Sequence, residues 1–105
     1  MAADPIQPLL SEFRDDPDMT ELVESFVQEL PARVATLAAC LESNQLADLQ
    51  RITHQLKGAS GGYGFPVLGE AAAKVESLLK SGAETGSVMA SVKELIALCQ
   101  RVRMM

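Results

Sequence analysis

The chain has 105 residues, of which 48% are hydrophobic, and its formal net charge at pH 7 is −5. This length provides for one domain with one apolar core. Because the chain is acidic and shows no basic stripe, nucleic acid and anionic membrane surfaces are excluded as expected partners. No apolar run reaches the roughly 20 residues that a membrane-spanning helix needs.

The N-terminus and the two cysteines predict the compartment. Residues 1–7 lack the basic segment and the apolar run of a signal peptide. Cys40 and Cys99 lie within apolar helical patterns and have no spacing typical of metal ligands. We therefore expect two buried, reduced thiols in a cytoplasmic protein.

The first part of the chain predicts a short helix followed by a long one. Apolar residues at helical spacing indicate a helix over residues 6–13, which an acidic segment ends. Asp18, with Glu21 three residues later, forms a capping box that starts the long helix. Pro31 interrupts the apolar stripe of this helix, but the stripe continues in phase, so we predict one kinked helix ending at residues 43–44.

Three further helices follow. Asn44 can cap a third helix, whose inner face is expected to comprise Leu46, Leu49, Ile52 or Thr53, Leu56 and Ala59. Pro66 suits the first turn of a fourth helix. Its inner face is expected to comprise Val67, Leu68, Ala71, Val75, Leu78 and Leu79. Residues 81–82 end this helix, and residues 85–87 are interpreted as a polar break before a fifth.

The order and spacing of these elements predict the architecture. The sequence shows no strand alternation, and short connections favour antiparallel neighbours. We therefore predict a single all-α domain over residues 1–105. It is an antiparallel up-down-up-down four-helix bundle, with its core at about residues 18–103 and a short extra helix at the N-terminus.

The only histidine has an unusual neighbourhood. His54 lies away from the middle of the buried stripe of its helix, so we expect a solvated or half-solvated imidazole. Lys57, Gly58 and Gly61 share its face. Each glycine inside a helix costs about 1 kcal/mol relative to alanine. Clearance for another protein's backbone is one reason to place glycines there; the alternative is that they only end the helix. Clearance is favoured for Gly58, and the two interpretations are equal for residues 61–64.

The segment from His54 to Gly64 reads HQLKGASGGYG. It resembles the signature of histidine-containing phosphotransfer (HPt) domains and of the phosphoryl-accepting domain of chemotaxis histidine kinases. That pattern is a histidine, a Lys-Gly pair at the third and fourth following positions, small residues, and a glycine near position ten. The Glu-Leu-Pro segment at residues 29–31 and the domain length also match, so the resemblance covers about residues 6–103.

The resemblance implies roles for individual residues. His54 is the phosphoacceptor through Nε2, and Glu76 on the next helix accepts a hydrogen bond from Nδ1–H and orients the ring. Without the resemblance, Glu76 would read as an exposed helical glutamate. Lys57 compensates the charge of the phosphoryl group, although alone it would read as a solvated surface lysine. Together with Lys57 and part of the helix that begins after Asp18, the expected docking surface comprises Gln50, Gln55, Gly58, Gly61 and Gly62.

The function implied by the resemblance is that of a phosphorelay intermediate in two-component signalling. The chain would exchange a phosphoryl group with an aspartate of a response-regulator receiver domain. Its partners would be such a receiver, a hybrid sensor histidine kinase, or both. It would act as a monomeric carrier rather than an enzyme, because it lacks a kinase domain. It would need no cofactor or metal of its own, and Mg²⁺ is expected on the partner receiver.

Two other classes of protein compete with this interpretation. An interaction module could keep the bundle and bind a receiver or kinase without being phosphorylated, but such a module has no need for the intact His-x-x-Lys-Gly set. A hydrolase or metalloprotein is disfavoured, because His54, Glu70, Glu76 and two scattered cysteines are too sparse for a zinc site. No second base completes a nucleophilic triad.

Overall fold

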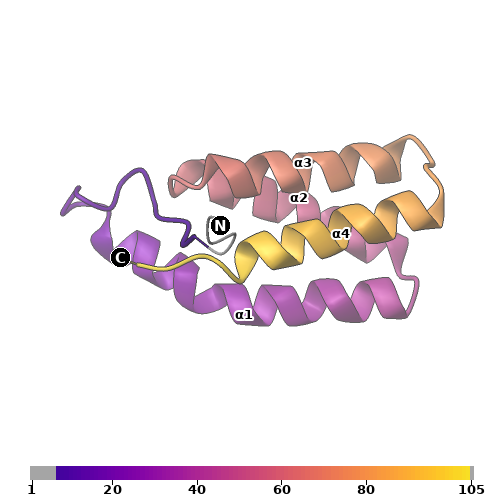
Figure 1. Cartoon of the computed structure of the whole chain (residues 1–105), viewed down its shortest axis with the longest axis horizontal. Helices are drawn as coiled ribbons and strands as arrows, with labels where there is room; N and C mark the ends of the chain where they lie inside the picture. The colour runs from indigo at the N-terminus through magenta and orange to yellow at the C-terminus, as the bar shows by residue number, and fades with distance from the viewer. Residues whose placement is uncertain (1–6, 105) are drawn as a thin grey trace, which may run out of the picture.

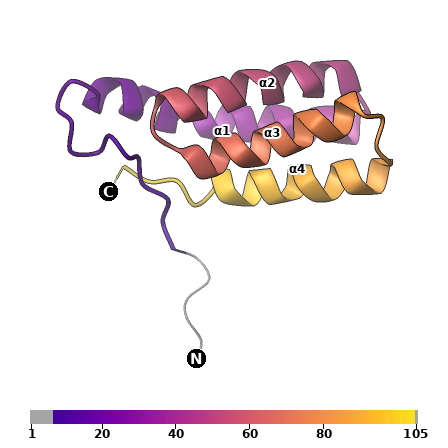
Figure 2. The ribbon, with the colours of Figure 1, turned by 90° about the horizontal axis from the view of Figure 1, so that it is seen from above.

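The computed structural model describes residues 7–104, which form four α-helices and no β-strand (Figure 1). The helices are α1 (Thr20–Glu42), α2 (Leu46–Gly62), α3 (Pro66–Lys80) and α4 (Thr85–Cys99). α1 packs against α2 and α4, and α3 likewise packs against α2 and α4, whereas the Cα atoms of the diagonal pairs do not come within 8 Å of each other in the described residues. In Figures 1 and 2 each connection turns the chain back, so that the helices form a ring. The prediction of an all-helical, four-helix fold is confirmed.

A continuous apolar core fills the space inside this ring, and every helix contributes one buried stripe. Its largest completely buried apolar side chains are Leu37, Leu49, Leu56, Leu68, Val75, Val92 and Leu95. Leu46 and Val67 were expected inside but are each 45% exposed. Both belong to the first turns of their helices, although Leu68, in the same turn as Val67, is completely buried. Cys40 and Cys99 are both buried free thiols, as predicted, and burial raises the pKa of Cys99 to about 11.

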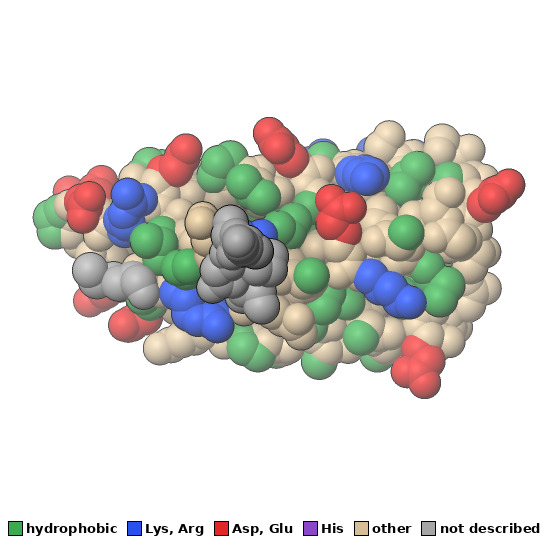
Figure 3. All heavy atoms as spheres, viewed as in Figure 1, with side chains coloured by type: hydrophobic (Ala, Val, Ile, Leu, Met, Phe, Trp, Pro, Cys, Tyr) green, Lys and Arg blue, Asp and Glu red, His purple; other side chains and the backbone are tan. Residues whose placement is uncertain are grey.

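None of the helices within residues 7–104 combines the length and the apolar character needed to cross a bilayer. On the face seen in Figure 3, acidic and basic side chains are interspersed, and no continuous stripe of one sign follows a helix.

The long first helix is continuous through Pro31, as predicted, but its start differs from the expected capping box. α1 begins at Thr20, two residues after Asp18, and no side chain caps it. Instead, Oδ1 of Asp16 accepts the backbone N–H of Asp18 at 2.9 Å. Because the residue before a proline is held in an extended conformation, Asp16 ahead of Pro17 is suited to this turn. The backbone N–H of Asp18 is therefore bonded within this turn, and α1 starts two residues later at Thr20.

Two other helix boundaries also differ from the prediction. Asn44 does not cap α2; its φ of 55° places it in the left-handed region, where it ends α1. Gln45 precedes α2 without a side-chain cap. Thr85 starts α4 directly, so the expected polar break at residues 85–87 is the first turn of that helix. Pro66 does occupy the first turn of α3, and Gly82, with φ 70°, follows its end.

The predicted short helix over residues 6–13 is wrong for residues 7–13, and Ile6 lies outside the described residues. Residues 7–13, here called the N-terminal strap, run across the end of the bundle (Figure 2). Leu9 forms a parallel bridge with Val102: the Leu9 N–H donates to the carbonyl of Arg101 at 2.9 Å, and the Arg103 N–H donates to that of Leu9 at 3.0 Å. A helix of eight residues is marginal in water, and the C-terminal segment supplies backbone partners that such a helix would not use.

Candidate functional site

The imidazole of His54 projects outward from the middle of α2. Its neighbours Ile52, Thr53 and Leu56 point into the core and are buried, whereas 65% of the His54 side chain is exposed. The buried hydroxyl of Thr53 donates to the carbonyl of Gln50 at 3.0 Å, so this polar group is satisfied within the helix. The helical period alone therefore places His54 at the surface, as the sequence predicted.

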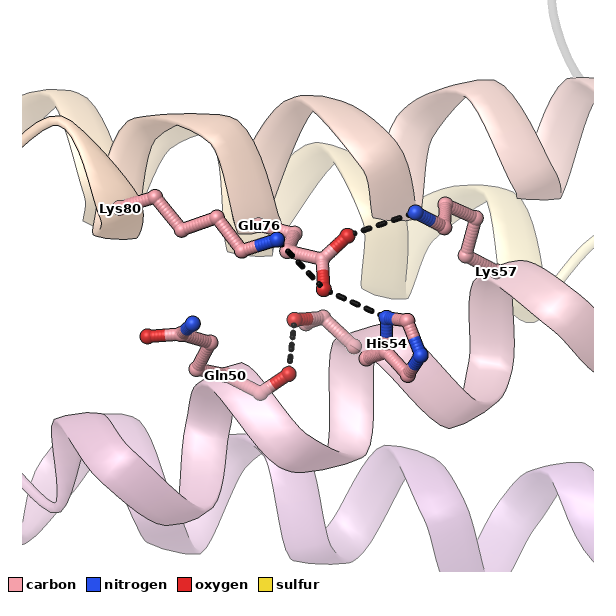
Figure 4. Close-up of polar contacts among 6 residues, drawn as sticks. Gln50, His54, Lys57, Glu76 and Lys80 are labelled. Carbon is pink, nitrogen blue, oxygen red and sulfur yellow. Dashed lines mark hydrogen bonds and ion pairs between the residues drawn. The ribbon is translucent and has the colours of Figure 1, made fainter.

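Glu76 reaches the imidazole from α3. Its Oε2 lies 2.7 Å from Nδ1 of His54, and only 5% of its side chain is exposed (Figure 4). A close approach of the two helices allows this contact. A Cβ at Gly69 would lie 3.6 Å from the Lys57 carbonyl oxygen and 3.8 Å from the Gly61 nitrogen, so the α3 backbone lies close to α2 at this point, although an alanine would also fit. Glu76 follows two turns later on the same side of α3.

Two ammonium groups also surround the Glu76 carboxylate. Nζ of Lys57 lies 2.8 Å from Oε1, and Nζ of Lys80 lies 3.6 Å from Oε2 (Figure 4). The hydrogen bond from Lys57 is the main reason why the pKa of Glu76 falls from 4.5 to about 2. Burial opposes this shift, while the His54 hydrogen bond and the charges of the two lysines favour it. Glu76 is therefore ionised at neutral pH.

The ionised carboxylate determines which tautomer of the neutral imidazole is present. A carboxylate can only accept hydrogen bonds, so Nδ1 of His54 must carry the proton that it shares with Glu76 at 2.7 Å. In the neutral ring, Nε2 then holds the lone pair. Figure 4 shows this second ring nitrogen turned away from Glu76. The arrangement presents a nucleophilic nitrogen on the open side of the ring.

The expected docking residues line α2 on either side of His54. A shallow depression beside the imidazole is lined by Ala47, Gln50, Arg51, His54, Gln55, Glu76 and Lys80. The three glycines lie further along α2, outside this depression. A Cβ added at Gly58, Gly61 or Gly62 would meet nothing within 4 Å. The free protein therefore has no internal packing reason for a bare surface at these positions.

Lys80 is the residue of this site that the sequence reasoning missed. It follows Glu76 by four residues on α3, a spacing that places a glutamate and a lysine side by side on a helix. That spacing was a usable signal once Glu76 had been singled out. Lys57 was assigned to the phosphoryl group, whereas its ammonium here contacts Glu76. Within residues 7–104, no three His, Cys, Asp or Glu side chains are grouped to hold a metal ion.

The lowered pKa of Glu76 predicts how acid affects the fold. The native pKa of about 2 lies below the ordinary value of 4.5, so the ionised carboxylate stabilises the native state above pH 4.5. This contribution is lost as the pH falls from 4.5 through 2. We expect Glu76→Gln to reduce the pH dependence of the unfolding free energy in this window, measured by urea denaturation at several pH values. Equal slopes for the variant and the wild type would contradict this assignment.

Comparison with known proteins places this geometry in context. A family model described as Hpt domain matches residues 21–104. This span runs from the first turn of α1 into the C-terminal segment and includes His54, Lys57, Glu76 and Lys80. Neither the curated proteins nor the solved structures searched contain a match.

Proposed function

This chain belongs to the Hpt domain family, and we propose that it is a phosphorelay intermediate in which His54 exchanges a phosphoryl group with an aspartate of a receiver domain. Hpt domains are phosphocarriers of histidine phosphotransfer, and they interact with the receiver domains and kinases of two-component systems. The observation that carries the proposal is the exposed imidazole whose Nδ1 is hydrogen-bonded to a buried, ionised carboxylate. This leaves Nε2 available to a docked partner.

The proposed step transfers the phosphoryl group without moving a proton. The Nε2 lone pair attacks the phosphorus of an aspartyl phosphate on the receiver, opposite the oxygen of the leaving carboxylate. A P–N bond forms and the P–O bond to the aspartate breaks, so the aspartate leaves as a carboxylate. The proton stays on Nδ1 and the ring becomes an imidazolium. Glu76, 2.7 Å away, stabilises that positive charge, and the reverse step returns the group to an aspartate.

The partner contributes the rest of the reaction centre. Mg²⁺ held by the receiver would offset charge on the phosphoryl oxygens. On this chain, Lys57 is one helical turn from His54 and is proposed to turn toward the phosphoryl group once it is attached. The open surface at Gly58, Gly61 and Gly62, together with Gln50 and Gln55, is proposed to contact the receiver backbone.

The direct test is chemical. We expect the purified chain to acquire label when it is mixed with a receiver that has been phosphorylated by labelled acetyl phosphate and Mg²⁺. The label should be stable in base and lost in acid, as a P–N bond requires, and mass spectrometry should place it on His54. Receiver binding without label would instead favour the non-phosphorylated interaction module, and label on a serine or threonine would exclude the proposed carrier.

The open surface at Gly61 gives a separate prediction about docking. Gly61→Leu should leave the unfolding free energy of the free protein unchanged or raise it by up to about 1 kcal/mol, because a glycine near the end of a helix is replaced and the new Cβ meets nothing within 4 Å. Transfer from the receiver should nevertheless slow by about tenfold, since the leucine occupies space that the partner needs. Urea denaturation and rapid-quench transfer measure the two effects. Gly86→Leu, at an equally open position on α4, is the matched control. Unchanged transfer in Gly61→Leu would contradict the clearance argument.

A further inference from the structure

Two lysine ammonium groups lie beside the single negative charge of the Glu76 carboxylate. One carboxylate, 5% exposed, is approached by Lys57 at 2.8 Å and by Lys80 at 3.6 Å, in addition to Nδ1 of His54. The two lysines are not equivalent. Lys57 makes a hydrogen bond to Oε1, whereas Lys80 stands just beyond hydrogen-bonding distance of Oε2. Lys57 is the main cause of the lowered Glu76 pKa, and Lys80 contributes least among the causes.

Phosphorylation of His54 would place a second anion near Lys57. A phosphoryl group on Nε2 brings close to two negative charges within one helical turn of Lys57, and this attracts its ammonium. However, Lys57 already holds Glu76, which is almost completely buried. Removing one partner from a buried ion pair is costly because the remaining charge stays desolvated. The carboxylate is also needed at that moment, because the phosphorylated ring is cationic.

Lys80 is positioned to replace Lys57 beside the Glu76 carboxylate. It lies four residues after Glu76 on the same helix, so its contact does not depend on the position of α2. Its side chain is 59% exposed, and a small further approach brings its ammonium to hydrogen-bonding distance of Oε2. In Figure 4 the two lysines reach the carboxylate from opposite sides, so one can leave without obstructing the other.

We propose that Lys80 is a positioning residue that takes over the Glu76 carboxylate when Lys57 turns toward the phosphoryl group on His54. This inference rests on the proposed function. In the resting protein, Lys57 holds Glu76 and Lys80 is a second, looser partner. In the phosphorylated protein, Lys80 keeps Glu76 ionised and directed at Nδ1–H, and Lys57 contacts the phosphoryl oxygens. Two lysines thereby serve two anions that are present together only in the phosphorylated state.

The first experiment follows the two lysines by NMR. The wild-type chain is phosphorylated with phosphoramidate, which requires no receiver, and is kept above neutral pH, where the P–N bond persists. Nuclear Overhauser effects are measured between the Glu76 Hγ protons and the Hε protons of each lysine. On phosphorylation, the Lys57–Glu76 signal should weaken and the Lys80–Glu76 signal should strengthen. Unchanged signals on a phosphorylated chain would overturn the exchange.

The second experiment measures the consequence for transfer. Lys80→Met should slow transfer from a phosphorylated receiver to His54 by about fivefold, the upper end for a partly exposed ion pair, and Lys80→Arg should restore the rate. Lys74→Met is the matched control: Lys74 is on the same helix, is equally exposed at 59%, and pairs with exposed Glu94 at 3.7 Å. The midpoint of urea unfolding should be the same for both methionine variants.

The outcomes separate this inference from the function on which it rests. If the wild-type chain accepts no phosphoryl group from either donor, the proposed function fails and the lysine exchange fails with it. If the wild type is phosphorylated but Lys80→Met transfers as fast as Lys74→Met, only the role of Lys80 is wrong. A rate that falls in Lys80→Met and is not restored by Lys80→Arg would likewise overturn the assignment, because either cation can hold the carboxylate.

Discussion

Replacement of His54 by glutamine is expected to remove the acid-labile label completely while leaving the fold intact. Glutamine has no nitrogen lone pair that can attack phosphorus, and this is the only histidine of the chain. The side chain is mostly exposed, and Glu76 keeps both lysine partners after the change, so the unfolding free energy should stay within about 1 kcal/mol of wild type. Labelling with a phosphorylated receiver and urea denaturation measure the two properties.

The same variant distinguishes transfer from docking. Because glutamine preserves the size and polarity of the surface, His54→Gln should still bind the receiver with an affinity close to that of the wild type, which a pull-down or calorimetric titration can measure. Lys93→Gln, at an exposed position on α4, serves as the control and should label normally. Label that persists in His54→Gln would show that another residue carries the phosphoryl group.

Gly64→Ala is expected to cause a large loss of stability. Gly64 has a φ of 85°, which costs roughly 1–2 kcal/mol for a residue with a Cβ. The added Cβ would also lie 2.6 Å from Oγ of Ser11 and 2.9 Å from the backbone nitrogen of Glu12. Glu12 donates its N–H to the Gly64 carbonyl at 2.8 Å, so the N-terminal strap cannot move aside without losing that bond. We expect a total loss of about 2–4 kcal/mol in urea denaturation.

Gly82→Ala separates the two causes of this loss. Gly82 also has a left-handed φ, of 70°, but a Cβ there would meet nothing within 4 Å. Only the conformational cost of roughly 1–2 kcal/mol should appear at this position. The difference between the two alanine variants then reports the steric conflict with the strap. Equal losses at both positions would mean that the strap yields at no cost.

The sequence predicted those parts of the fold that depend on local chemistry. The apolar period crossed Pro31 without a break, Pro66 marked a first turn, and Gly82 marked a helix end; all three are as expected. The errors have long-range causes. The residues of the strap have helical spacing, but their backbone pairs with Val102 and its neighbours, about 90 positions away. No window of sequence around residue 9 contains that information.

The functional site likewise contains features that the local sequence predicts and one contact that it does not. The outward direction of His54 follows from the period of its own helix, and the bare surface around it follows from the glycines of that helix. The contact with Glu76 depends on how closely α2 and α3 approach each other, which periodicity does not reveal. For that contact the family resemblance was the only guide. The (i, i+4) spacing from Glu76 to Lys80 could have indicated Lys80, but its importance derives from a carboxylate that the sequence alone interprets as exposed.

The pairing of Leu9 with Val102 has a consequence for biosynthesis. Ribosomes make a chain from its N-terminus, so the strap is made before any of the four helices, whereas the partners of Leu9 follow the last of them. Leu9 therefore cannot pair with Val102 until all four helices have been made. A chain truncated after Gln100 should expose the start of the strap to proteolysis, whereas the 105-residue chain should protect it.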